Sequence, residues 1–477
     1  MRTGLLALFL GTSLFSVQCG SDPEPVTGKP QDPPDVSGGG CDASKTPAAG
    51  GCPVTDDDGF FVSPAGVDTN PGTKAAPFRN VGAGINASKT GTKRNVYICA
   101  GTYDEQLLID TAALGVALHG GFTCADWSYS AAKTTVAPQK AGYVLRVSGS
   151  PAVVEDLELL AKDGDVPGAS SIVSFVEAAP GMTFRRGRLV AGNGAAGKNG
   201  DPIAPYAVPA SKGADVPSSG ETPTTTCTCG SVTSTGGRGG SPTQLAGAGT
   251  PTIAGAPTFA GQPYNLCSAA SQPGANAGAD GKPAALARGA SNIGALSSQG
   301  WTPAKGEDGI DGDVAQGGGG GPGNAAFHSS GGGCGGCGGK GAAGGTGGGA
   351  SIALAVLNST VRVQGCELVA GNGGTGGNGG DAQQGQTGGP AGAVSQLGIP
   401  GCYGAIGGRG GDGAGGGGGA GGSSIGVLSV GAKELDVDKA ATFTLGKVGA
   451  GGTGGGPPST HGGFGIDGFA ATILGGS

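Results

Sequence analysis

Short apolar runs that alternate with polar residues dominate the chain after residue 58. Examples are AVVEDLELLA from Ala152, SIVSFVEAAPGMTFRRGRLVA from Ser171 and SIALAVLNSTVRVQGCELVA from Ser351. A period of two is typical of β-strands with one buried face. The segment from Val81 to Ser88 instead has the spacing of a short amphipathic helix. The pattern therefore predicts an all-β protein with one small helical cap.

A twelve-residue phrase occurs twice, as LVAGNGAAGKNG from Leu189 and as LVAGNGGTGGNG from Leu368. Each copy ends a β-type segment and runs into glycine-rich sequence. A degenerate third copy follows Ser424 and leads into GAGGTGGG at Gly449. The repeating unit is thus one β-rich coil, with a glycine-rich excursion leaving the same point each time. Insertions on one face are typical of solenoids.

The opening segment DGFFVSPAGVDTNPGTKAAPF is followed by NVYICAGTY. These segments resemble the first coil of the pectin-lyase-like right-handed parallel β-helices of bacterial surface and secreted proteins. The matching residues are Val62, Ser63, Gly66, Asp68, Asn70, Gly72, Thr73, Pro77, Phe78, Gly101 and Tyr103. The resemblance implies a right-handed parallel β-helix and assigns no activity, because such folds host many functions.

Aligning the coils predicts which side chains stack. Leu159, Leu189 and Leu368 form one inward column. Glu158, Arg188 and Glu367 form a column of alternating charge, which avoids like-charge neighbours. Glu155 and Asp156 fall on Arg185 and Arg186 in the same way. We expect a solvent-facing ladder here, while the competing interpretation is the acidic and basic equipment of a polysaccharide lyase.

Glycine supplies 110 of the 477 residues. Within the second excursion it recurs at period three, at Gly371, Gly374, Gly377 and Gly380. The tracts are either flexible loops or extended three-per-turn helices packed side by side where only glycine fits. Their out-and-back arrangement favours packing against the entropy cost of ordering glycine. We expect polyproline- or polyglycine-II-like insertions.

The N-terminus has the features of an export signal, with Arg2 before an apolar stretch from Leu5 to Leu10. Cys19 lies where a lipobox places its acylated cysteine. We expect export, with lipid anchoring in the bacterial outer membrane or at the cell surface. The predicted segments are a signal peptide (1–19), a flexible tether (20–57), cap and coils (58–191), a glycine-rich insertion (192–350), a coil (351–370), an insertion (371–422), a coil (423–448) and a glycine-rich end (449–477).

The remaining cysteines suit an oxidising compartment better than a zinc site. We pair Cys41 with Cys52 and Cys99 with Cys124. The residues expected to staple the excursions are Cys227, Cys229, Cys267, Cys334, Cys337 and Cys402. This leaves Cys366 as a lone thiol in the core.

Candidate chemistry is sparse. The net charge of −7, without a basic run, argues against nucleic acid as a partner. Asp308, Asp311 and Asp313 offer oxygen ligands for Ca²⁺, although a solvated acidic turn is the favoured interpretation. None of the three histidines lies in a catalytic motif. We therefore assign no catalytic, cofactor-binding or metal-ligating residue.

These features favour a non-enzymatic surface protein, a structural or adhesive scaffold that contacts polysaccharide. The first alternative is a polysaccharide lyase or glycoside hydrolase on a β-helix. The second is an ice- or matrix-binding glycine-rich protein.

Overall fold

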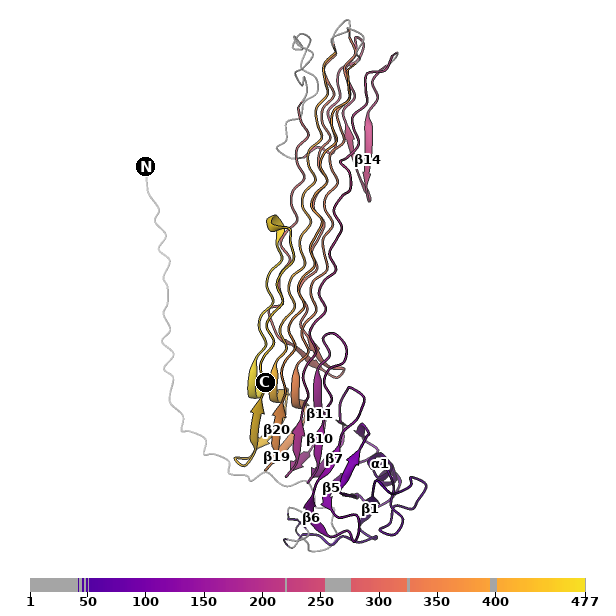
Figure 1. Cartoon of the computed structure of the whole chain (residues 1–477), viewed down its shortest axis with the longest axis vertical. Coiled ribbons are helices and arrows are strands. Elements are labelled where there is room, and N and C mark those ends of the chain that lie inside the picture. The colour runs from indigo at the N-terminus through magenta and orange to yellow at the C-terminus, as the bar shows by residue number, and fades with distance from the viewer. Residues whose placement is uncertain are drawn as a thin grey trace, which may run out of the picture.

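A computed structural model describes residues 51–218, 221–253, 276–323, 327–394 and 401–476, together with residues 42, 45, 46 and 49. Two regions are distinct in Figure 1: a β-helix, and a long stalk of extended glycine-rich segments that rises from it. No helix among the described residues has the length and apolar character needed to cross a membrane.

Three parallel sheets form the β-helix. The first strand belongs to sheet A, and after it each coil contributes one strand to each sheet in the order A, B, C. Sheet A contains β1 (Gly59–Val62), β2 (Asn95–Cys99), β5 (Val116–Phe122), β9 (Ala152–Glu155), β12 (Met182–Arg185), β19 (Thr360–Gln364) and β22 (Glu434–Val437), with β6 (Tyr129–Ala132) antiparallel to β5. Sheet B contains β3 (Gly101–Tyr103), β7 (Thr134–Val136), β10 (Glu158–Leu160), β13 (Arg188–Val190), β20 (Glu367–Ala370) and β23 (Thr442–Leu445). Sheet C contains β4 (Leu107–Ile109), β8 (Leu145–Ser148), β11 (Ser171–Glu177), β18 (Ser351–Leu357), β21 (Ser424–Val430) and β24 (Ala470–Gly476). The predicted parallel β-helix is confirmed.

The core consists of apolar columns that run along the stack. Leu159 pairs with Leu189, and Leu189 with Leu368, and all three side chains are buried. This register is the predicted one. Helix α1 (Val81–Thr90) covers the first coil and contributes Val81 and Ile85 to the same core. The expected cap is therefore confirmed.

Each glycine-rich excursion leaves after a strand of sheet B and returns at the start of a strand of sheet C. The three excursions connect β13 to β18, β20 to β21 and β23 to β24. At every exit the first backbone N–H donates to a serine hydroxyl that opens a sheet C strand of the preceding coil. The donor and acceptor pairs are Gly192 with Ser171, Gly371 with Ser351, and Gly446 with Ser424. A serine thus marks each point of departure.

The excursions pack as straight legs joined by backbone hydrogen bonds, and the partners advance by three residues. In the leg 371–382, Gly373 and Gly376 donate to Lys447 and Ala450 of one neighbouring leg. Gly374 and Gly377 donate to Gly349 and Thr346 of another leg. Successive N–H groups therefore point in different directions, as a three-residue turn requires. In the described residues of the insertions, the predicted polyglycine-II-like packing is therefore present.

The asparagines in the repeated phrase accept the third N–H group of a three-residue turn in the adjacent leg. The backbone N–H of Asn372 donates to Oδ1 of Asn193 at 2.9 Å, and that of Lys447 donates to Oδ1 of Asn372 at 2.8 Å. Asn199 and Asn378 form the same contact at 2.8 Å one step further along the stalk. Short amide side chains thus supply acceptors to the N–H groups of the adjacent leg.

Close approach of the legs excludes side chains at most of these glycines. A Cβ added at Gly377 would lie 2.1 Å from the carbonyl oxygen of Lys198, and one at Gly419 would lie 2.1 Å from that of Thr346. Both obstructing atoms belong to backbone that is itself packed, so neither can move aside easily. Glycine at every third position is therefore a steric requirement of the packed legs.

Two hairpins interrupt the first excursion. The hairpin of β14 (Thr225–Cys229) and β15 (Val232–Gly236) lies far from the β-helix along the stalk (Figure 1). The hairpin of β16 (Gly294–Ser297) and β17 (Gly300–Pro303) lies at the β-helix, where Leu296 and Trp301 pack with the outer face of sheet C. A short 3₁₀ turn, η2 (Pro458–Thr460), interrupts the third excursion. The segment 449–477, expected to be glycine-rich, also contains β24.

The steric requirement predicts that Gly377→Ala destabilises the stalk. We expect a loss of roughly 3 kcal/mol, at the upper end of overpacking costs, because the methyl group would overlap fixed backbone. Chemical denaturation and hydrogen exchange of the glycine tracts would measure the change. Gly181→Ala is the matched control, since a Cβ at Gly181 meets nothing within 4 Å. Equal stability of the two variants would contradict the packing.

Candidate functional site

The candidate site is a cleft of about 320 Å³ at the corner where sheet A passes into sheet B. Its lining residues are Gly121, Ala131, Ala132, Lys133, Thr134, Asp156, Leu157, Glu158, Arg186 and Arg188. Three of these are cations and two are carboxylates. No other lining side chain carries a charge.

Two-residue turns between the sheets build the corner. Asp156 and Leu157 connect β9 to β10, and Arg186 and Gly187 connect β12 to β13. Asp156 and Arg186 have φ of 57° and 50°, in the left-handed region that non-glycine residues rarely adopt. The equivalent residue of the next coil is Gly365, with φ of 58°. Two charged side chains thus occupy a backbone position that glycine fits without strain, which is a common feature of functional sites.

Arg186 holds Asp156 with a two-pronged contact. Its Nε donates to Oδ1 at 2.9 Å and its Nη2 donates to Oδ2 at 2.8 Å. The hydroxyl of Tyr129 donates to Oδ1 as well, at 3.1 Å. A carboxylate has about four acceptor positions. Donors from the described part of the chain occupy three of them, which leaves one on Oδ2. The side chain of Asp156 is 8% exposed.

Glu158 lies in the predicted charge ladder. Arg188 contacts Glu158 through Nη1 and Glu367 through Nε, each at 2.8 Å. The predicted stacking of these three residues is confirmed. Lys133 and Thr135 also donate to Glu158, both at 2.8 Å. Burial raises the pKa of Glu158, but the donors from Lys133, Arg188 and Thr135 together lower it. The ionised form is therefore favoured.

A third acidic residue lies behind the cleft. Glu155 contacts Arg185 and Arg186, each at 3.1 Å, and accepts from Nδ1 of His119 at 2.6 Å. Burial acts to raise the pKa of Glu155, but the hydrogen bond and charge of His119 and the charges of both arginines lower it to about 2. His119 also contacts Asn95 at 3.0 Å and stacks on Tyr97. A connected network therefore extends from His119 to Tyr129.

The expectation of a solvent-facing ladder is wrong for Glu155 and Glu158, whereas Arg188 and Glu367 of the same ladder are 41% and 43% exposed. Glu155 and Glu158 are only 4% and 5% exposed. The connection between β5 and β7 is longer than the equivalent two-residue turns and includes β6, and its Tyr129 and Lys133 contact the ladder. The alignment of repeats missed these residues, together with His119 and Thr135, because no other coil has an equivalent connection. In the sequence, only the unequal spacing of the apolar runs indicates the longer connection between β5 and β7.

The weak calcium candidates do not form a metal site. Asp308 pairs with Lys305 and accepts the backbone N–H of Gly344, and Asp311 pairs with Lys340. Asp313 lies on the same glycine-rich leg. Within the described ranges, no group of three or more potential ligands comes together. These carboxylates instead serve packing between legs.

The structure brings several of the predicted cysteines together. Cys99 pairs with Cys124 as predicted, Cys227 pairs with Cys334, and Cys229 pairs with Cys337. Cys52 and Cys402 are also disulfide-bonded. Cys19, Cys41 and Cys267 lie outside the described residues.

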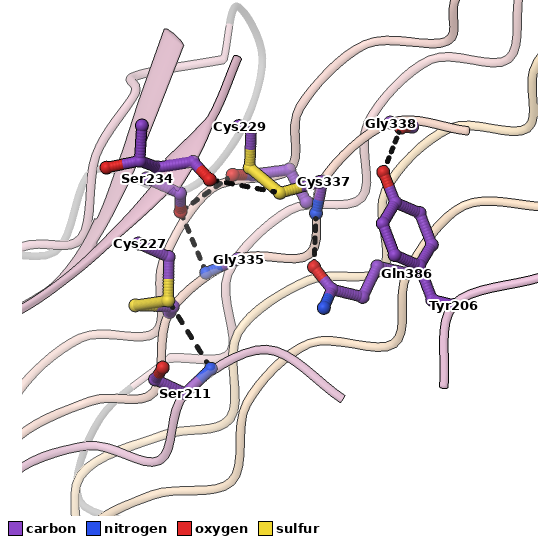
Figure 2. Close-up of a disulfide and its surroundings, with 12 residues drawn as sticks. Tyr206, Ser211, Cys227, Cys229, Ser234, Gly335, Cys337, Gly338 and Gln386 are labelled. Carbon is purple, nitrogen blue, oxygen red and sulfur yellow. Dashed lines mark hydrogen bonds between the residues drawn. A yellow bond between two sulfur atoms is a disulfide. The ribbon is translucent and has the colours of Figure 1, made fainter. Parts of the chain in front are cut away.

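Two of these disulfides fasten the β14–β15 hairpin to a leg of the stalk, as Figure 2 shows. Ser234 of the hairpin accepts the backbone N–H of Gly335 at 2.8 Å between them. Alternate residues of a strand point to one side. Cys227 and Cys229 therefore both face the leg, and the predicted stapling of the excursion by cysteines is confirmed for this hairpin.

Cys366 is a free, buried thiol, as predicted. It follows Gly365 in the corner turn, and the register of the adjoining strands places it next to Gly187 of the preceding coil. Burial raises the pKa of Cys366, so the reactive thiolate is disfavoured. The residue therefore acts as a small apolar group of the core.

No protein-family model matches the sequence, and no curated protein matches it. Solved structures that match include pectin methylesterase PemA from Erwinia chrysanthemi (14% identity, TM-score 0.22) and the pectin methylesterase from Aspergillus niger (17%, 0.21). The alignments cover 30% and 28% of this chain, and 45% and 44% of the enzymes. A rhamnogalacturonan lyase also matches, at 15% identity and a TM-score of 0.18, over 27% of this chain and 35% of that one.

These neighbours agree with the predicted pectin-lyase-like β-helix. They contradict the expectation of a non-enzymatic scaffold, because the proteins named are carbohydrate-active enzymes. The chain spans less than half the length of these enzymes, and likeness of this extent concerns the β-helix alone. Activity has to be argued from the cleft itself.

The ionic network predicts acid sensitivity. The folded-state pKa of Glu155, about 2, lies below its ordinary value of 4.5, so its contribution is complete above pH 4.5 and is lost as pH falls towards 2. The contribution is on the order of 3 kcal/mol. Unfolding free energies measured across this range should fall more steeply for the wild type than for Glu155→Gln. Parallel pH profiles for the two proteins would contradict the assignment.

Proposed function

We propose that this protein is a carbohydrate-active enzyme that hydrolyses ester groups on a polysaccharide bound in the cleft. The observation that carries the proposal is the pairing of two acceptor carboxylates, Asp156 and Glu158, with three cations at the rim. Ester hydrolysis can use a carboxylate as base or nucleophile, and positive charge can stabilise the oxyanion that develops. The cleft offers both.

Asp156 is the residue placed at the reacting centre. The contact with Arg186 fixes its orientation, and the remaining acceptor position on Oδ2 is available for a water molecule or for attack on an ester carbon. Lys133 and Arg188, with side chains 71% and 41% exposed, flank the cleft and would stabilise the negative charge that develops on the ester oxygen. In hydrolysis by activated water, the water oxygen bonds to the ester carbonyl carbon while Asp156 accepts a water proton. The ester C–O bond then breaks, and the protonated Asp156 returns that proton to the departing alkoxide, which leaves as the alcohol.

Glycoside hydrolysis fits the cleft less well. That reaction needs a carboxyl group that keeps its proton, with a raised pKa, to protonate the leaving oxygen. The pKa of Glu158 is lowered rather than raised. Burial does raise the pKa of Glu105, but this carboxylate accepts the N–H groups of Val81 and Gly82 at the start of α1. Its role is that of a helix cap.

The test is an assay of purified protein on methyl- or acetyl-esterified polysaccharides, with three readouts: released methanol or acetate, unsaturated uronate, and new reducing ends. We expect alcohol or acid release alone. Asp156→Asn should lower kcat about 100-fold or more, because it removes the base. Glu177→Gln is the matched control, since its partner Arg146 lies outside the cleft lining. Detection of unsaturated uronate would indicate β-elimination in place of ester hydrolysis. Absence of all three products would contradict the proposal that the protein is an enzyme.

We also propose that the protein is exported and anchored to the bacterial surface through acylated Cys19, where it meets its polysaccharide. The disulfides support an oxidising compartment. Export from the cytoplasm would also bring an enzyme of this kind to extracellular polysaccharide.

The anchor predicts that the mature protein partitions into detergent and that Cys19→Ala releases it into the aqueous phase, because one or more acyl chains hold it to lipid. Phase partitioning of membrane extracts measures the difference. Cys366→Ala is the matched control, since it removes a cysteine that forms no disulfide and lies in the β-helix core. Identical partitioning of Cys19→Ala and the wild type would contradict the anchor.

A further inference from the structure

Part of the cleft lining comes from the segment between β5 and β7, residues 123–133, which we call the cleft wall. The hydroxyl of Tyr129 in this wall donates to Asp156 at 3.1 Å. Lys133, at the end of the wall, pairs with Glu158 at 2.8 Å. Whether these two carboxylates keep their partners therefore depends on the position of the wall.

Regular structure holds the cleft wall only weakly. Among the described strands, β6 pairs with β5 alone, through two residue pairs with a shift of register between them. Trp127 and Ala131 have φ of 58° and 53°, in the left-handed region that disfavours residues other than glycine. Such conformations persist where surrounding contacts hold them. The wall therefore depends on its ties to the rest of the β-helix.

A disulfide supplies one such tie. Cys124 lies in the wall, five positions before Tyr129, and is bonded to Cys99 of β2. Cys99 is 0% exposed and packs in an apolar cluster with Phe61. Trp127 joins the same cluster, with its ring edge-on to Phe61 at 4.7 Å between centroids. The disulfide thus fastens a strained segment to a buried strand, and it limits the conformations open to the wall.

We propose that the Cys99–Cys124 disulfide positions Tyr129 and Lys133 for the reaction in the cleft, so that full activity requires the oxidised pair. This inference rests on the proposed function, because it concerns the same cleft. With the disulfide open, the wall can leave the ladder, and Asp156 then loses one of the hydrogen bonds that orient it. An enzyme built in this way becomes active after it leaves a reducing cytoplasm.

Reduction of the pair by a dithiol proceeds by exchange. The Sγ of Cys124 is the accessible sulfur, because Cys124 is exposed and Cys99 is buried. A thiolate of the dithiol bonds to this Sγ, and the S–S bond breaks with its electron pair on Cys99. The second thiolate of the dithiol then attacks the dithiol sulfur of the mixed disulfide and releases Cys124. The dithiol is oxidised to a cyclic disulfide, and the two cysteines take up its two protons.

Hydrogen exchange of the purified full chain tests the tie directly. The backbone N–H groups of Thr123 and Trp127 donate within the wall, to Ser128 and Thr123. In Cys99→Ala/Cys124→Ser we expect both groups to exchange about tenfold faster or more, because the wall opens locally. Strands β12 and β13 should keep their protection and serve as the internal reference.

Ester hydrolysis gives the functional readout. We expect the kcat of this double variant to fall roughly 10- to 100-fold, because a small displacement of positioning groups has an effect of this size. Dithiothreitol should lower the kcat of the wild type to the same level and leave the double variant unchanged. In Tyr129→Phe/Lys133→Met, which lacks both contacts, dithiothreitol should lower kcat no further, because the effects of groups that act as one unit are not additive.

The matched control is Cys229→Ala/Cys337→Ala, which removes a disulfide of the β14–β15 hairpin, far from the β-helix along the stalk (Figure 1). Its hydrogen exchange in the wall and its kcat should equal those of the wild type. Circular dichroism and thermal melting would show that each variant is folded.

Unchanged exchange at Thr123 and Trp127 in Cys99→Ala/Cys124→Ser would overturn the proposal. So would faster exchange with an unchanged kcat, or a fall in kcat that the control shares. If the wild type hydrolyses no ester, the proposed function fails, and the exchange measurement alone decides whether the disulfide holds the wall.

Discussion

The close approach of backbone to backbone between glycine-rich legs is the constraint on which the rest of the stalk depends. A methyl group at Gly377 would lie 2.1 Å from a carbonyl oxygen of the next leg. Ordering glycine costs more conformational entropy than ordering any other residue. Hydrogen bonds between legs and the disulfides at the β14–β15 hairpin offset this cost. The β-helix also contributes, because it fixes the position at which each leg begins.

The β-helix fixes where each leg begins, because each leg continues in the register of the strand that precedes it. Leu368 pairs with Phe443 in adjacent coils, and Asn372 accepts the N–H of Lys447, which is likewise 75 residues further along the chain. The legs therefore leave the corner already aligned, and the serine at each exit satisfies their first N–H group. One stack of coils thereby positions both the stalk and the charged cleft.

The repeats let the sequence predict the parts of the fold that recur. The Leu159, Leu189 and Leu368 column and the Glu158, Arg188 and Glu367 ladder follow from coils whose corner turns have equal length. The cleft could not be predicted in this way, because Tyr129 and Lys133 come from a connection that occurs once. That connection supplies the contacts to Asp156 and Glu158 that distinguish the cleft from a repeating ladder.

Residue-resolved hydrogen exchange in the second excursion tests the central claim most directly. The account predicts slow exchange at Gly373, Gly374, Gly376 and Gly377, whose N–H groups all donate to neighbouring legs. It also predicts slow exchange at Asn372 and Asn378, which donate to the asparagines of the preceding leg. Uniformly fast exchange across these residues, with the strands of the β-helix still protected, would contradict the ordered stalk.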